Sequence, residues 1–379
     1  MKYGLLYYKD TDNIGDDIQS YAAARFLPKI DYLVDREDLE GFVPNKKEKV
    51  KVIMNAWYIH DKYNFDISPY IDPLHISIFL KKFPYEAGVT IGSDYINENV
   101  ISNYKKYGPV GTRDLHTKKL LDKLNVDNYF SGCMTLTINR FDDVEKEDYI
   151  VVVGLTDEEV TYIKSKTNRK VIRFIQDVKK KSFSNETWNE RKKRVEDTLK
   201  LYQGAHMVIT NKLHCSLPCL ALGTPVLLLY DRSFAENKDR IGTFLPYLNH
   251  INREDLTTAN IDFEKPKKNP TKYLELRKEL EDKCYKFVES KTSSEKLPEI
   301  SQYLEYVKRS RVMRNLPIKK LEQLQKVYEK ECLKSSKMYE EIAKYEELKA
   351  KYSEVCHKYR RYQKFDNFAC KIVNLIRHK

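Results

Sequence analysis

Residues 208–225 read VITNKLHCSLPCLALGTP, which is typical of a buried strand, a polar turn and a small-residue helix in direct succession. The strand is predicted to end at Thr210, and the turn is Asn211–His214. Such a turn places a cation and an imidazole beside a helix N-terminus, whose free N–H groups favour an anion. We therefore expect Lys212 and His214 to face a phosphate or carboxylate. A capping histidine beside a solvated lysine would give the same pattern.

Strands and helices alternate on both sides of this turn. Strands are predicted at Tyr149–Val153, Lys170–Ile175 and Pro225–Tyr230, with helices near Asp157–Lys166 and Glu190–Tyr202. Alternation of this kind predicts a parallel sheet covered by helices on both faces.

The first 145 residues repeat the same alternation. The predicted elements are strands at Lys2–Tyr8, Asp31–Val34, Val50–Asn55, Gly88–Ile91 and Gly108–Thr112, and helices at Asp17–Leu27 and Asp114–Leu124. The fold class is therefore predicted as α/β, with two Rossmann-like domains in a glycosyltransferase-B-like arrangement. We place the domains at 1–145 and 149–292, with the charged stretch 142–148 between them and a basic helical or coiled-coil tail at 293–379.

Composition narrows the class of protein. Hydrophobic residues make up 41% of the 379 residues, which supports packed domains. No run approaches the roughly 18 apolar residues of a transmembrane helix, and the N-terminus reads as a strand rather than a signal peptide. The seven cysteines form no CxxC pair, so we expect a reduced, cytoplasmic protein without structural zinc. No ligand spacing for a catalytic metal is present.

The basic charge is concentrated in the tail. The whole chain carries a net charge of +12, and residues 293–379 hold 21 Lys and Arg against 12 Asp and Glu. An apolar face with flanking cations between Phe365 and Lys379 resembles an interfacial helix. It fits a peripheral contact with the inner membrane face, or packing on its own coiled coil or a second subunit. Nucleic-acid binding is not expected, because acidic residues are interleaved with the basic ones.

Two further strand ends carry polar residues. The loop Asn13–Asp17 follows the first strand, where Asn13 and Asp16 could bind sugar hydroxyls and Gly15 could permit a tight turn. N-capping of the following helix by Asp16 or Asp17 is the structural alternative. Ser93 and Asp94 end another predicted strand, where they fit either a site or a simple turn.

Three motifs in this order resemble the polysaccharide pyruvyl transferase family. They are NIGDDIQ from Asn13, GPVGTRD from Gly108 with YFSGCMTL from Tyr129, and KLH at 212–214 followed by ALGTP at 221–225. The resemblance spans about residues 3 to 250. At the position of Lys212 the family carries Arg, and Lys cannot make the bidentate fork that Arg makes with an anion.

The resemblance implies phosphoenolpyruvate as donor, a sugar or lipid-linked saccharide as acceptor, and a pyruvate ketal as product. His214 would act as acid and base, Arg113 and Lys212 would hold the anionic donor, and Asn211 would lie beside them. No cofactor is implied beyond the donor. A nucleotide-sugar-dependent glycosyltransferase of the same fold and a non-enzymatic scaffold remain the alternatives.

Overall fold

The computed structural model describes residues 1–58, 66–80, 83–84, 90–91, 98–176, 185–233 and 240–311, and eleven further positions between 330 and 351. The chain divides into two compact units, Met1–Lys308 and Arg309–Lys379. In the second, the described positions from 330 to 351 are helical.

The first sheet is parallel and has the strand order β2-β1-β3-β5. Its strands are β1 (Lys2–Tyr7), β2 (Tyr32–Asp35), β3 (Val50–Ile53) and β5 (Ile71–Leu74). Two short parallel pairs accompany it, β4 (Trp57–Tyr58) with β6 (Phe79–Leu80) and β9 (Val110–Thr112) with β10 (Asn128–Phe130). The strand predicted at Gly88–Ile91 is only β8 (Thr90–Ile91), which forms an antiparallel pair with β7 (Phe83–Pro84).

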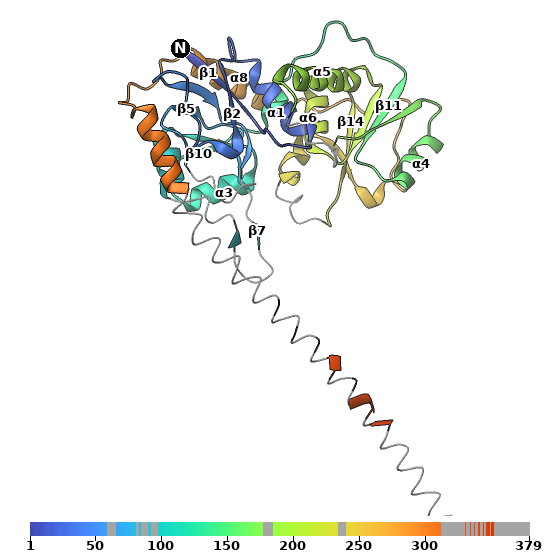
Figure 1. Cartoon of the computed structure of the whole chain (residues 1–379). Coiled ribbons are helices and arrows are strands. Elements are labelled where there is room, and N and C mark those ends of the chain that lie inside the picture. Colours follow the sequence, from blue (N-terminus) through green and yellow to red (C-terminus); the bar gives the residue numbers. More distant parts are fainter. Residues whose placement is uncertain are drawn as a thin grey trace, which may run out of the picture. The chain divides into compact units, whose positions relative to one another are not determined.

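The second sheet has five parallel strands in the order β12-β11-β13-β14-β15 (Figure 1). They are β11 (Tyr149–Val153), β12 (Lys170–Phe174), β13 (Met207–Thr210), β14 (Val226–Tyr230) and β15 (Asn249–Asn252). This is a doubly wound order, in which the connections reverse direction between β11 and β13. Ligands bind doubly wound sheets at the carboxyl ends of the strands that flank this reversal.

The helices begin and end at recognisable local signals. Thr156 and Thr187 form capping boxes at the starts of α4 (Asp157–Ser165) and α5 (Trp188–Gly204). Asp114 caps α3 (Leu115–Lys123), and Gly223 ends α6 (Leu213–Leu222) in the left-handed conformation that glycine favours. Further helices are α1 (Ile14–Ala24), α2 (Glu98–Lys106) and α8 (Tyr273–Glu289), and 3-10 segments are η1 (Arg36–Asp38), η2 (Met134–Thr137), η3 (Gly242–Tyr247) and η4 (Arg253–Asp255).

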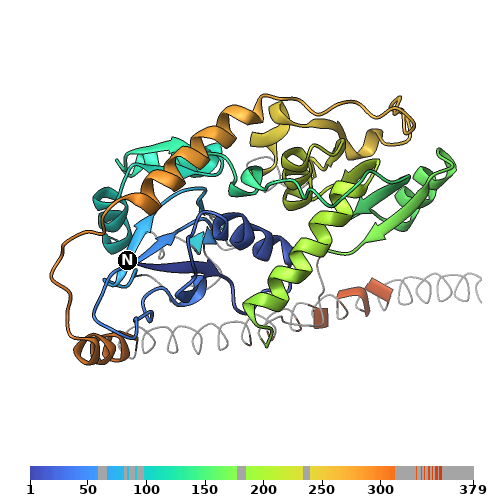
Figure 2. The ribbon, with the colours of Figure 1, turned by 90° about the horizontal axis from the view of Figure 1, so that it is seen from above.

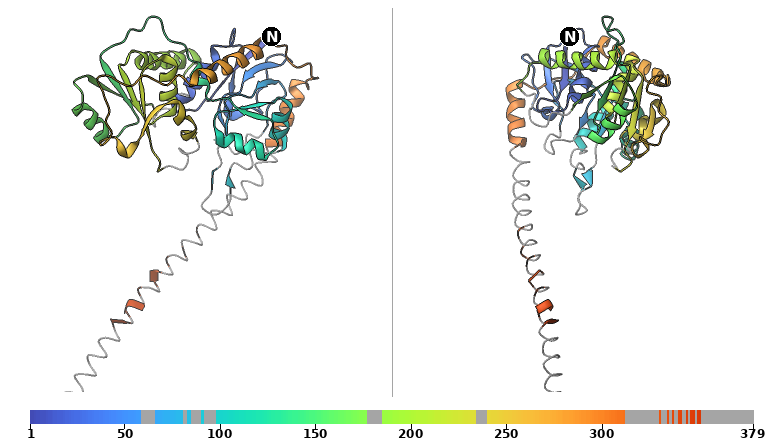
Figure 3. Two further views of the ribbon diagram at one scale, coloured as in Figure 1. Left: turned by 180° about the vertical axis from the view of Figure 1, so that it is seen from behind. Right: turned by 90° about the vertical axis from the view of Figure 1, so that its right-hand side faces the viewer.

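One hydrophobic core joins the two sheets. It contains residues from β1 and α1 together with residues from β11, α5, α6 and α8. In Figure 2, α1 and α5 run beside each other between the two groups of strands. Figure 3 shows α8, in orange, lying over the same region from behind. The Tyr273 hydroxyl at one end of α8 donates to the carbonyl of Leu220, and at the other end the carbonyl of Val288 accepts from Tyr3.

The predicted α/β class with parallel sheets is therefore confirmed. The division into two separate Rossmann-like domains is not confirmed, because residues 1–308 form one compact unit with a shared core. Most of the predicted coiled coil and the whole apolar face from Phe365 onward lie outside the described residues. Within the described part of the chain, no helix has the length and apolar character needed to cross a membrane.

Candidate active site

Two strand-to-helix turns meet where the two sheets approach each other. The β1–α1 loop belongs to the first sheet and the β13–α6 turn to the second, and α1 packs against α6. The backbone N–H of Ile14 donates to the carbonyl of Gln176 (3.3 Å), while the Gln176 side chain donates to the carbonyl of His214 (3.0 Å). A single buried glutamine thus ties the two turns together.

His214 lies at the start of α6 but does not occupy the N-cap position of this helix. Lys212 occupies the N-cap position, with no capping bond from its side chain. Its backbone N–H donates to Oγ1 of Thr210 (2.9 Å), which closes the turn. His214 departs from helical geometry at φ −81° and ψ 18°, so α6 is kinked at this residue. The predicted alternative of a capping histidine is therefore wrong.

The imidazole of His214 is held neutral. Burial lowers its pKa well below the ordinary value, and the charges of Arg113 and Arg240 lower it further. Its Nε2 atom is buried and has no hydrogen-bond partner among the described residues. On the other side, the ring lies against Gly15, where an added Cβ would be 3.0 Å from Nδ1. A neutral imidazole can accept a proton, so its first chemical step is that of a base.

Arg113 is, with Arg191, one of the two largest fully buried side chains in the described residues. It follows β9, and its backbone N–H donates to the carbonyl of Ile78 (2.8 Å). Nη1 donates to Oε1 of Gln19 on α1 (2.6 Å), and the guanidinium carbon lies 5.0 Å from the centroid of the Phe79 ring. Within the described part of the chain, its Nε and Nη2 have no hydrogen-bond partner. A buried cation with two unused donors is costly unless an anion binds there.

Asn211 and Lys212 lie against the end of β11. Gly154 follows that strand with φ +74°, and an added Cβ would meet Oδ1 of Asn211 at 2.1 Å and Cε of Lys212 at 3.1 Å. Only glycine, which has no Cβ, lets the two segments of the backbone approach this closely. The Oδ1 atom of Asn211 is buried and accepts no hydrogen bond from any described residue. Both residues thus stand at the reversal point between β11 and β13, as expected for ligand-binding residues.

The polar residues of the β1–α1 loop bond to the protein itself. Asn13 is the N-cap of α1, and its Oδ1 accepts from the N–H of Gly15 (2.7 Å). Asp16 accepts from the Thr11 hydroxyl (2.7 Å) and pairs with Arg36 (3.4 Å). The predicted N-capping by Asp16 or Asp17 is therefore wrong. Gly15 is not among the glycines with positive φ, and its lack of a Cβ allows the close approach of His214.

Asp17 joins the loop to α5. Its carboxylate is fully buried and pairs with Arg191 (3.1 Å) and Arg194 (3.0 Å). Burial raises the pKa of Asp17, while the two guanidinium groups oppose that rise. Arg191 also donates to the carbonyl of Tyr8 (2.8 Å). The cluster fixes the β1–α1 loop against α5.

The structure brings together most of the predicted site and adds residues that the sequence did not indicate. His214 lies against Gly15 and is affected by the charge of Arg113. Asn211 and Lys212 belong to the same turn as His214. Ser93 and Asp94 lie outside the described residues. The added residues are Gln19, Gln176, Gly154 and Arg240. No group of three or more His, Cys, Asp or Glu side chains within the described ranges is arranged to hold a metal.

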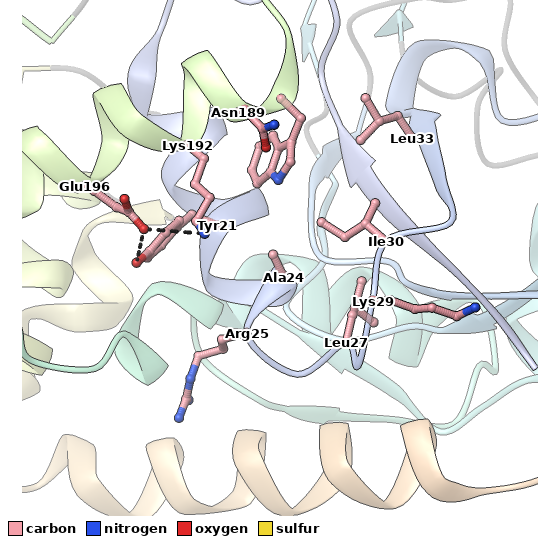
Figure 4. Close-up of a pocket in the computed structure, with 11 residues that line it drawn as sticks. Tyr21, Ala24, Arg25, Leu27, Lys29, Ile30, Leu33, Asn189, Lys192 and Glu196 are labelled. Carbon is pink, nitrogen blue, oxygen red and sulfur yellow. Dashed lines mark hydrogen bonds and ion pairs between the residues drawn. The ribbon is translucent and has the colours of Figure 1, made fainter.

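A cavity of about 590 Å³ lies elsewhere, between α1, α5 and the edge strand β2 (Figure 4). Leu27, Ile30 and Leu33 line one wall, and Glu196 accepts from the Tyr21 hydroxyl on the other. None of the residues with unused buried donors or acceptors lines it. Its size therefore does not make it the reaction site.

Comparison with known proteins gives one strong match and several distant ones. The sequence model of the polysaccharide pyruvyl transferase family matches residues 13–233. No curated protein matches the chain.

Several solved structures share a low level of similarity. A functionally uncharacterized protein from Klebsiella pneumoniae is 11% identical, with a TM-score of 0.38 over 66% of this chain and 92% of that one. UDP-GlcNAc 2-epimerase from Methanocaldococcus jannaschii is 11% identical, with a TM-score of 0.34 over 82% and 99%. The wall teichoic acid polymerase TagF is 9% identical, with a TM-score of 0.34 over 83% and 89%.

Proposed function

The chain belongs to the polysaccharide pyruvyl transferase family and is a transferase, and on this premise we propose that it moves an enolpyruvyl group from phosphoenolpyruvate to a sugar. The acceptor is a saccharide of a surface-polysaccharide precursor, and the product is a cyclic pyruvate ketal with release of phosphate. The observation that carries the proposal is the neutral imidazole of His214, whose buried Nε2 has no partner among the described residues, near the buried cation of Arg113.

The donor supplies what this site lacks. Phosphoenolpyruvate carries a phosphate and a carboxylate, and Arg113 has two buried nitrogen donors, Nε and Nη2, without described partners. Charge-assisted hydrogen bonds to an anion would compensate the burial of the guanidinium. Lys212 at the N-cap of α6 adds a second cation at the positive end of the helix dipole. The buried Oδ1 of Asn211 can accept a hydrogen bond from a hydroxyl of the acceptor sugar.

The proton movements follow from the neutral imidazole. His214 accepts a proton from the attacking sugar hydroxyl and becomes an imidazolium, which the bound dianion stabilises. The proton then passes to the methylene carbon, which becomes a methyl group, while the sugar oxygen bonds to the central carbon. The carbon–oxygen bond to phosphate breaks, and a second hydroxyl closes the ketal with its proton leaving on phosphate.

Donor choice is the first experiment. Thermal shift with phosphoenolpyruvate and with a panel of nucleotide sugars compares the leading function with a glycosyltransferase. We expect stabilisation by phosphoenolpyruvate; stabilisation by a nucleotide sugar alone would overturn the proposal.

The role of His214 is the second experiment. His214→Asn should slow phosphate release in the presence of acceptor by about 10²- to 10⁴-fold, as loss of a general acid–base does. Phosphoenolpyruvate should still stabilise the variant, because the cations remain. An unchanged rate would leave the scaffold alternative standing.

The proposal also assigns a role to the tail, which would attach the cytoplasmic protein to the inner face of the membrane. The excess of 21 basic over 12 acidic residues in 293–379 supports contact with an anionic surface, here the inner membrane leaflet. Flotation with anionic vesicles should carry the full chain and leave a chain ending before Phe365 behind. Equal flotation of both would favour a contact between subunits, which sedimentation would show as a change of oligomeric state.

A further inference from the structure

Arg240 is a second guanidinium at the candidate site, and it lies outside the family match at 13–233. It lies two residues before η3, whose N-cap Ile241 and whose Phe244 are buried. Thr243 in the same segment accepts a hydrogen bond at Oγ1 from the backbone N–H of Leu115 (3.3 Å). The backbone that carries Arg240 is therefore anchored on the half of the structure that contains Arg113.

Two touching aromatic rings carry the two guanidinium groups. The Trp57 and Phe79 rings meet edge to face, with centroids 5.6 Å apart. The guanidinium carbon of Arg240 lies 5.3 Å from the Trp57 centroid, and that of Arg113 lies 5.0 Å from the Phe79 centroid. Arginine stacks well on aromatic faces, which hold the planar group in one orientation.

The two cations and His214 act on one another electrostatically. The charge of Arg240 lowers the pKa of Arg113 and that of His214, in both cases as an addition to the effect of burial. Two like charges held on adjoining rings favour an anion that neutralises both.

We propose that Arg113 and Arg240 form a two-guanidinium site for the dianionic donor, in which Arg240 supplies the bidentate donor group that Lys212 lacks. This rests on the proposed function. It explains how the chain can carry Lys at the family's Arg position, because the planar fork reaches the same ligand from a different element. A phosphate or carboxylate accepts two parallel N–H bonds from such a fork.

Calorimetric titration of the full-length protein with phosphoenolpyruvate tests the proposal. Arg240→Gln should weaken binding about 10- to 100-fold, which is the usual effect of losing hydrogen bonds to a charged group. Arg240→Lys should weaken it less, because the charge remains and only the fork is lost. The matched control is Arg232→Gln, which removes an equal charge from an exposed position in the segment after β14 and should bind as the parent does.

A second substitution separates ligand binding from a structural effect. Adding Lys212→Arg to Arg240→Gln returns a fork beside His214 and should recover part of the lost affinity, which repacking alone would not do. If Arg240→Gln does not fold, Arg240→Lys with and without Lys212→Arg gives the same comparison. Equal binding by the parent and the Arg240 variants would overturn this inference alone. Failure of the parent to bind phosphoenolpyruvate would overturn the proposed function as well.

Discussion

The β1–α1 loop and the β13–α6 turn occupy equivalent places in the two sheets, yet they use their polar groups differently. In the first, Asn13 caps its helix, Asp16 pairs with Arg36, and Asp17 pairs with two arginines of α5. In the second, His214 and Asn211 each bury an atom without a described partner. The polar groups of the first loop bond to the protein, whereas those of the second turn include the buried atoms to which the proposed function assigns a ligand.

This difference distinguishes polar groups that stabilise the fold from polar groups that are proposed to bind or react with a ligand. A buried polar group that lacks a partner costs about 1–3 kcal/mol, so a protein keeps it only where something repays the cost. Substitutions in the β1–α1 loop should therefore act mainly on stability, and those in the β13–α6 turn mainly on binding and rate. Gly15 is the one position where the two turns touch.

The largest effect is expected at Asp17. Asp17→Asn keeps the shape of the side chain and removes the charge that compensates Arg191 and Arg194. Breaking a buried ion pair on one side costs about 3–5 kcal/mol. Chemical denaturation should show this loss, while Asp197→Asn, which breaks an exposed pair with Lys193 on the same helix, should have no measurable effect. Equal stability of the two variants would contradict the structural role assigned to the loop.

The next effect is expected at the contact between the turns. Gly15→Ala places a methyl group 3.0 Å from Nδ1 of His214 and 2.9 Å from Oδ1 of Asn13. The imidazole must move, and a displacement of about 1 Å can cost 10²-fold in rate. We expect the transfer rate to fall about 10- to 100-fold.

A double variant shows whether this loss passes through the imidazole. Gly15→Ala should slow the His214→Asn protein little further, because the group that it displaces is already absent. Additive losses would mean that Gly15 acts by another route.

Parts of the second sheet could be predicted to the residue. The predicted bounds Tyr149–Val153 are those of β11, and the strand end predicted at Thr210 is that of β13. Both segments are continuous apolar runs rich in branched residues, buried on both faces, and such a signal depends on no other part of the chain. The same reasoning placed His214 and Arg113 at strand ends, and thus in one candidate site.

Prediction was weaker where the answer depends on distant residues. The first helix was expected to start at Asp17 and starts at Ile14, because Asn13 takes the cap. Asn and Asp are nearly equal as caps, and what removes Asp17 from that role is Arg191, 174 positions away. Arg240 and Gln176 carry no local signal at all, since their importance comes only from the elements against which they pack.

The imidazole of His214 in the β13–α6 turn should make the stability of the protein depend on pH. The pKa of His214 is lower in the folded protein than in the unfolded chain, so the unfolded chain binds more protons below about pH 6.5. Above that pH the imidazole is neutral in both states and does not reduce the free energy of unfolding. The free energy of unfolding decreases as the pH falls through 6.5 towards the pKa of the folded state. The loss is at most about 1.4 kcal/mol per pH unit.

Comparison with His214→Asn isolates this contribution. His75 is also buried, and burial lowers its pKa to about 4, so it adds the same pH dependence to both proteins. The parent should lose more stability than the variant between pH 6.5 and 5.5. Parallel curves would show that His214 titrates normally and that its surroundings are less cationic than the structure indicates.

The smallest effect is expected at the satisfied cap of the β1–α1 loop. Asn13→Ala removes the oxygen that accepts from the N–H of Gly15, and loss of such a cap costs about 1 kcal/mol. Asn13→Asp keeps an acceptor at the same place and adds a charge that the helix N-terminus favours, so it should restore the parental stability. Denaturation midpoints of the three proteins measure the difference. If Asn13→Asp proves as destabilising as Asn13→Ala, the amide group of Asn13 has a role beyond capping. Asn13 would then have to be grouped with the site residues of the β13–α6 turn and not with the structural residues of its own loop.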